Sequence, residues 1–143
     1  LGVAAVELGD TDGDVRSQVV ERFANATFVA PNERQMELVA QVVGAIERPG
    51  GAHQIPLDIR GTAFQRLVWE AISRISPGAT MTYAEVARNI GAPSSSRAVA
   101  QACAMNPMAV VIPCHRVVGS DGSQGGYRWG AGRKQALQER ERG

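Results

Sequence analysis

A cysteine followed directly by a histidine is the part of this sequence best suited to chemistry. Cys114 and His115 come after Pro113, at the end of the apolar segment 109–112. A cysteine attacks carbon as its thiolate, and with an ordinary pKa of about 8.5 it is only slightly ionised at neutral pH, so it needs a base. If a strand over 109–112 continues through the pair, the two side chains point to opposite faces, and His115 would take the proton through a water molecule.

The same pair has less specific interpretations. A free cysteine is often only a small buried hydrophobic residue. A thiol hydrolase places its histidine far from its cysteine in the sequence, whereas here the two are adjacent. The two cysteines, Cys103 and Cys114, are too few for a disulfide scaffold, and the two histidines, His53 and His115, lack zinc-ligand spacing. We therefore expect free thiols, no metal and no other cofactor.

The residues around the pair resemble the active-site motif of the O6-alkylguanine-DNA alkyltransferases, also called methylated-DNA–protein-cysteine methyltransferases. The matching motif is Ile112-Pro113-Cys114-His115-Arg116-Val117. Further segments match in the family's order and spacing, and they are 61–65, 82–83, 97–99, 106–107 and 126–130. The likeness runs from about residue 56 to the end, and it is greatest to the C-terminal methyltransferase part of the bacterial adaptive-response proteins.

The resemblance implies DNA repair by direct reversal of damage. A methyl or other alkyl group would move from O6-alkylguanine, and from O4-alkylthymine as a further candidate substrate, to Cys114. A thioether is a poor leaving group, and the sequence shows no second nucleophile that would regenerate the thiol, so each molecule should react once. Two alternatives remain: a helix-turn-helix transcription factor, which would need an evident basic surface or dimerising segment, and a lesion-binding relative that has lost its cysteine, which Cys114 argues against.

The resemblance also assigns roles to residues outside the pair. Glu141, seven residues after Lys134, would orient the His115 imidazole and stabilise its charged form. Asn106 matches the family's hinge asparagine. Tyr83 would donate a hydrogen bond to the departing guanine, which is a poor anion. The implied substrate pocket consists of Val117, Tyr127, Trp129 and Lys134, and the Trp129 indole should narrow it in favour of methyl groups.

Two short helices carry the expected DNA contacts. A helix over 83–89, a tight turn at Gly91 and a helix over 97–105 have the spacing of a helix-turn-helix. The guanidinium of Arg97 could stack in place of a flipped guanine, and small neighbours such as Ala98 suit the minor groove. The net charge of +1 is too small to indicate nucleic-acid binding by the protein as a whole. Any DNA-binding surface must therefore be confined to one part of the molecule. The expected DNA-binding residues are Arg97, Ala98 and Tyr83.

The elements that must position these residues fall into two parts. Residues 1–55 are predicted to form a small α/β domain, with an edge strand over 2–8 and helices over 15–23 and 32–47. Because the chain opens on Leu1 within an apolar run, we expect this unit to lack its first strands.

Residues 56–143 are predicted to form the mostly α-helical DNA-binding and alkyltransferase domain. Its expected elements are a short strand at 56–59, a helix from Thr62, the helix-turn-helix, a short active-site strand at 109–112, a glycine-rich loop over 119–132 and a last helix from Arg133.

Length and composition limit the classes of protein that remain. The 143 residues, 44% of them apolar, suffice for one or two small domains with a buried core. No apolar run approaches the roughly 18 residues of a membrane span, and the first residues lack the layout of a signal peptide. We therefore expect a cytoplasmic monomer whose partner is double-stranded DNA containing O6-alkylguanine, with no membrane contact.

Overall fold

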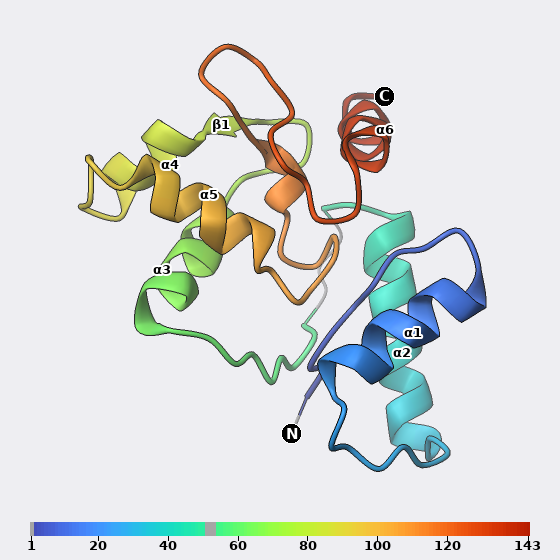
Figure 1. Cartoon of the computed structure of the whole chain (residues 1–143). Helices are drawn as coiled ribbons and strands as arrows, with labels where there is room; N and C mark the ends of the chain where they lie inside the picture. Colours follow the sequence, from blue (N-terminus) through green and yellow to red (C-terminus); the bar gives the residue numbers. More distant parts are fainter. Residues whose placement is uncertain (1, 51–53) are drawn as a thin grey trace.

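The chain forms a helix-rich structure with one small parallel sheet (Figure 1). A computed structural model describes residues 2–50 and 54–143. Its helices in these ranges are α1 (Asp12–Arg22), α2 (Glu33–Glu47), α3 (Ala63–Ile72), α4 (Tyr83–Asn89), α5 (Ser96–Ala104) and α6 (Ala131–Arg142). A single 3-10 turn, η1 (Cys114–Arg116), precedes strand β2 (Val117–Val118), which pairs in parallel with β1 (Met81–Thr82).

Local sequence signals fix where the first four helices begin. Each starts at a capping box, in which the cap side chain and the side chain three residues later bond each other's backbone N–H groups. At α4, the Thr82 hydroxyl accepts from the Glu85 N–H at 3.1 Å, and the Glu85 carboxylate accepts from the Thr82 N–H at 2.7 Å. The predicted helix start at Thr62 is therefore confirmed, and the helix predicted over 83–89 begins directly after the cap residue Thr82.

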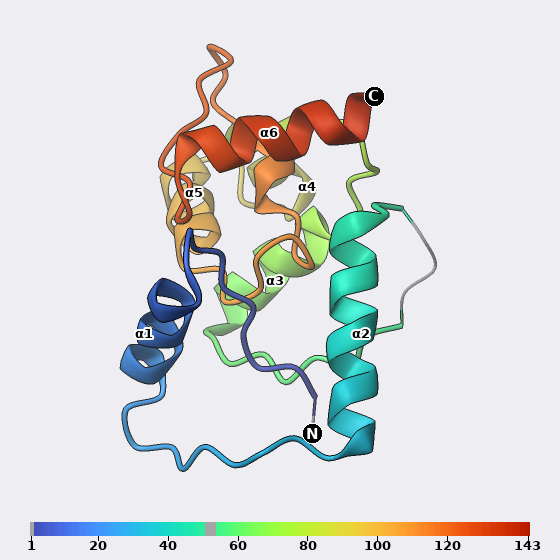
Figure 2. The ribbon, with the colours of Figure 1, turned by 90° about the vertical axis from the view of Figure 1, so that its right-hand side faces the viewer.

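The main core lies between α3, α4 and α5. Val68, Val86 and Val99 supply fully buried side chains from the three helices, one from each. The Trp69 indole N–H donates to the Ala102 carbonyl at 2.8 Å and so fastens α3 to α5. Helix α6 crosses over η1 on the other side of this core (Figure 2). The Cys-His pair is thus enclosed between the helical core and α6.

The predicted active-site strand at 109–112 is wrong. The segment consists of turns, in which the Val111 N–H donates to the Ala109 carbonyl at 2.7 Å and the Ile112 N–H to the Met108 carbonyl at 3.1 Å. Val110 has φ 66°, a left-handed conformation that β-branched residues seldom adopt and that ends any extended run. The apolar character of the segment reflects its burial, which does not distinguish a strand from buried turns.

The N-terminal part contains less sheet than predicted. Within the described residues, the edge strand expected over 2–8 is reduced to two isolated bridges, Val3 with Leu57 and Val6 with Met108. The strand expected at 56–59 is likewise reduced to one bridge, in which Leu57 pairs with Val3. Helix α2 confirms the helix predicted over 32–47, but none of its residues is fully buried: Ile46 packs against the cluster of Ala109, Val110 and Trp129, whereas Met36, Val39 and Val43 are exposed. None of the described helices has the length and apolar character to cross a membrane.

A buried carboxylate joins the N-terminal segment to the last loop of the chain. The Glu7 side chain is fully buried and pairs with Arg22 and Arg128, each at 3.0 Å. It also accepts the indole N–H of Trp129 at 2.8 Å. Arg128 in turn donates to the Asn106 carbonyl at 3.1 Å. The N-terminal segment is therefore tied to residues that lie close to the Cys-His pair.

Glu7→Gln should destabilise the fold, because it leaves two arginines facing a buried site that has lost its negative charge. Removing one partner of a buried pair costs roughly 3 kcal/mol, and since Arg22 and Arg128 are partly exposed we expect about 2 kcal/mol in unfolding free energy. The matched control is Asp10→Asn, which breaks the exposed pair with Arg133 and should cost less than about 0.5 kcal/mol. Denaturant unfolding measures the free energy of unfolding of both variants. An equal loss of stability in the two would contradict this account of Glu7.

Candidate active site

The Cys114 thiol is held by one asparagine side chain. Asn106 is fully buried, and its Nδ2 donates to Cys114 Sγ at 3.1 Å and to the Ile112 carbonyl at 2.9 Å. Its Oδ1 accepts the Met108 N–H at 2.8 Å. The asparagine therefore fixes both the turn that precedes η1 and the direction of the sulfur.

Burial keeps this thiol protonated. Cys114 is only 3% exposed, and desolvation raises the pKa of its thiol well above the usual range. A hydrogen bond with the Cys103 side chain raises the pKa further, while the Asn106 amide and the charge of Lys134 oppose the rise. At neutral pH Cys114 is therefore a thiol, and attack by its sulfur would require removal of the thiol proton.

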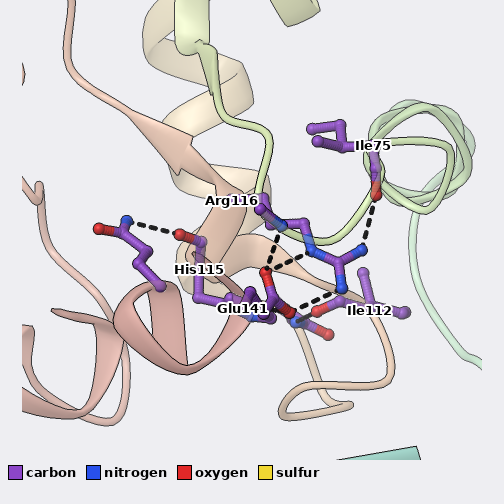
Figure 3. Close-up of polar contacts among 8 residues, drawn as sticks. Ile75, Ile112, His115, Arg116 and Glu141 are labelled. Atoms are coloured by element: carbon purple, nitrogen blue, oxygen red, sulfur yellow. Dashed lines mark hydrogen bonds and ion pairs between the residues drawn. The ribbon is translucent and has the colours of Figure 1, made fainter. Parts of the chain in front are cut away.

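A buried carboxylate organises the next two residues of η1 (Figure 3). Glu141, whose side chain is 2% exposed, lies 2.7 Å from His115 Nε2 and accepts two hydrogen bonds from Arg116, at 2.7 and 3.0 Å. Arg116 Nη1 also donates to the Ile75 carbonyl at 2.6 Å. Such a two-point contact between guanidinium and carboxylate fixes geometry as well as charge.

The ionisation of this trio follows from the contacts. Burial alone would raise the pKa of Glu141, but the hydrogen bonds from Arg116 and His115 outweigh it and lower the pKa, so the carboxylate is charged. Burial lowers the pKa of His115, and the bond and charge of Glu141 only partly oppose this. A neutral imidazole beside a carboxylate carries its hydrogen on Nε2 and donates it to Glu141.

The free ring nitrogen of His115 is available as a base. In the tautomer set by Glu141, Nδ1 carries a lone pair, and this buried atom makes no hydrogen bond to the described residues, the thiol included. The strand alternation expected for the pair does not apply, because Cys114 and His115 lie on the 3-10 turn η1. The expected relay through water remains a prediction.

Two tyrosines and a lysine lie beside the thiol. Lys134 Nζ lies 5.8 Å from the centre of the Tyr83 ring and 5.9 Å from that of Tyr127. Burial raises the pKa of Tyr83 to about 12 and raises that of Tyr127 as well, with the nearby Cys114 adding to both shifts. Both phenols therefore stay protonated and can donate a hydrogen bond. Val117, another expected pocket residue, is fully buried on β2 directly after η1.

The remaining expected site residues lie elsewhere. Arg97 is exposed and Ala98 half-buried at the start of α5. The Trp129 indole packs against Ala109 and Val110, donates its N–H to Glu7 and lies edge-on to the Tyr127 ring, with the ring centroids 5.4 Å apart. Its apolar ring is thus used for packing against the N-terminal segment. The expectation that this indole narrows the pocket remains a prediction.

Comparison with known proteins shows which family this chain belongs to. Residues 63–143 match the DNA-binding domain of 6-O-methylguanine DNA methyltransferase. The chain belongs to this family. It is 46% identical over 128 residues to a methylated-DNA–protein-cysteine methyltransferase of Mycolicibacterium paratuberculosis, in an alignment that covers 85% of this chain and 78% of that protein.

Two further relatives show how much of each protein the similarity covers. The chain is 43% identical over 140 residues to the bifunctional transcriptional activator/DNA repair enzyme Ada of Escherichia coli, which covers 98% of this chain but 40% of that protein. The chain thus spans less than half of that relative's length. The crystal structure of Mycobacterium tuberculosis OGT in complex with DNA superposes with a TM-score of 0.71 at 39% identity, covering 79% of this chain and 71% of the other.

The candidate site also contains residues for which the sequence predicted no role. Arg116 stands inside the recognised motif, and its position directly after the Cys-His pair could have indicated a partner for Glu141. Glu7 and Arg128 are 121 residues apart, and Gln138 reaches the His115 carbonyl from α6 at 2.7 Å. No local pattern announces such long-range contacts.

The sequence contains only two histidines, so the His115 imidazole can be titrated directly by NMR. We expect His115 to titrate below the ordinary value of 6.5, because burial opposes its charged form. Glu141→Gln should lower the pKa further, since it removes the hydrogen bond and charge that favour imidazolium. Glu139→Gln, a substitution at an exposed position of the same helix, should leave the pKa of His115 unchanged. Titration of His115 above 6.5, or an upward shift in Glu141→Gln, would overturn this assignment.

Proposed function

We propose that this protein repairs DNA by moving a methyl or other alkyl group from O6-alkylguanine to Cys114. The observation that carries the proposal is the pairing of a buried, protonated thiol with a neutral imidazole whose tautomer is set by Glu141. Family relatives are named methylated-DNA–protein-cysteine methyltransferases, which supports the same reaction. O4-alkylthymine is a further candidate substrate of the same chemistry.

The proposed step conserves atoms and charge. The sulfur attacks the alkyl carbon, a C–S bond forms and the bond between that carbon and guanine O6 breaks. The thiol proton passes through a water molecule to His115 Nδ1, and Glu141 stabilises the imidazolium. The Tyr83 hydroxyl, which stays protonated, donates to the guanine that leaves with the electron pair. The resulting thioether holds the alkyl group irreversibly, so one molecule repairs one lesion.

The proposal includes a way to reach a base inside a duplex. Helices α4 and α5, joined by a turn in which Gly91 has φ 75°, would act as a helix-turn-helix that enters the minor groove. Exposed Arg97 would fill the gap left by the flipped guanine, beside the small residue Ala98. A related OGT structure in complex with DNA supports duplex DNA as the partner.

The remaining parts of the proposal concern organisation. We assign DNA binding and chemistry to residues 56–143 and a supporting role to residues 1–55, whose Glu7 reaches the loop before α6. The protein would need no cofactor, because the reaction requires only the thiol, the imidazole and the carboxylate. We further propose that it works as a cytoplasmic monomer.

Incubation with excess methylated duplex should add one methyl group per protein molecule, all of it on Cys114. Intact mass and peptide mapping measure this, and Cys114→Ala should show no transfer while still binding duplex DNA. Product beyond one equivalent, or methyl groups on Cys103, would contradict the proposed single transfer.

Arg97→Ala and Tyr83→Phe should separate base flipping from chemistry. Arg97→Ala should slow single-turnover transfer from duplex DNA about tenfold or more and spare reaction with the free alkylated base, which needs no flipping. Tyr83→Phe should slow both, because its hydroxyl serves the leaving guanine. The charge-matched control is Arg66→Ala, at an exposed arginine of α3. If Arg97→Ala slowed transfer from the free base as much as transfer from duplex DNA, at unchanged thermal stability, Arg97 would have no role in base flipping.

A further inference from the structure

Two glutamine side chains, buried Gln138 and half-buried Gln124, form a hydrogen-bonded pair beside the site. Gln138 Nε2 donates to Gln124 Oε1 at 3.0 Å, and Gln124 Nε2 donates back to Gln138 Oε1 at 3.2 Å. The second hydrogen of Gln138 Nε2 goes to the His115 carbonyl at 2.7 Å. This amide pair therefore connects three segments: α6, the loop that holds Gln124, and η1.

The loop over 119–130 is attached to α6 at Gln124 in two ways. Besides the amide pair, Lys134 Nζ donates to the Gln124 backbone carbonyl at 2.5 Å. Lys134 and Gln138 are four residues apart on α6 and so share one face of the helix, and both are buried. Separation of the pair would leave the buried Gln138 amide without one of its partners, so the contact holds the loop against α6.

The residue after Gln124 closes the loop over Tyr83. A Cβ atom at Gly125 would lie 2.5 Å from the Tyr83 hydroxyl, and Gly125 has φ 62°, so only glycine lets the loop approach this closely. Tyr127 follows on the same loop and packs against the cluster that contains Cys114. The loop is thus one wall of the space around the thiol.

The closed position of this wall has a consequence for substrate size. Cys114 is 3% exposed, and the loop that carries Gly125 and Tyr127 is one of the segments that cover it, so displacement of this loop would give a base and its alkyl group access to the sulfur. A bulky alkyl group requires a larger displacement than a methyl group. The contacts that resist displacement therefore discriminate against bulky groups.

We propose that the Gln124–Gln138 amide pair is a specificity-determining contact, which holds loop 119–130 against the site and favours methyl over bulky alkyl groups. This inference rests on the proposed transfer to Cys114 and deepens it. Gln138 acts here as a positioning residue, because it works through the loop and the His115 carbonyl.

The test compares single-turnover transfer from free O6-methylguanine and free O6-benzylguanine. Gln138→Met removes the amide while keeping an unbranched side chain of similar size, and Gln124→Met removes the other half of the pair. Gln135→Met is the matched control, since Gln135 is exposed on the same helix and bonds only Glu139 among the described residues. Thermal melts of each variant report folding.

We expect each single variant to raise the ratio of benzyl to methyl rate constants about five- to tenfold, and the double variant to raise it no further, because one pair is being broken. Gln135→Met should leave the ratio unchanged. An unchanged or lowered ratio in both single variants, or independent effects that multiply in the double variant, would overturn the inference. If Gln138→Met fails to fold, the loop variant Gln124→Met decides. Absence of transfer by the unmodified protein would instead overturn the proposed function.

Discussion

The buried carboxylate of Glu141 is the contact on which the site depends. It receives two hydrogen bonds from Arg116 and one from His115, and Arg116 also donates to the Ile75 carbonyl in the turn that follows α3. Such a charge is stable out of water only when its partners satisfy it, and here the guanidinium supplies most of that compensation. Burial lowers the pKa of His115 and the charge of Arg116 acts in the same direction, so the imidazole remains neutral and keeps a lone pair on Nδ1.

The same helix that supplies Glu141 holds the rest of the site. Lys134 and Gln138 lie on α6 with Glu141, and they bind the glycine-rich loop and the carbonyl of His115. The result is a closed arrangement in which the thiol keeps its proton, and thiols in this state are poor targets for adventitious reaction. Reactivity then depends on a substrate that displaces the loop and on a base that is already oriented. Closure and activation are thus consequences of one helix packing over η1.

How much of this was predictable differs from residue to residue. The Cys114-His115 pair is visible in the sequence because its chemistry is local, and family resemblance pointed to Glu141, which the structure does place beside His115. The strand at 109–112 could not be distinguished from buried turns, since the left-handed Val110 is set by the surrounding fold and carries no local signal. The hydrogen bond between Trp129 and Glu7 could not be predicted, because the two residues are 122 positions apart. Contacts of that separation are decided by tertiary packing.

The protonation state of the resting thiol tests the central claim most directly. In a Cys103→Ser background, the ultraviolet absorbance of the Cys114 thiolate can be followed against pH, with a variant that lacks both cysteines as the blank. The account predicts no thiolate at neutral pH, where transfer nevertheless proceeds, and an absorbance step above the ordinary thiol pKa of about 8.5. A thiolate already formed at neutral pH would contradict it, because activation would then require neither His115 nor the Glu141 contact that orients it.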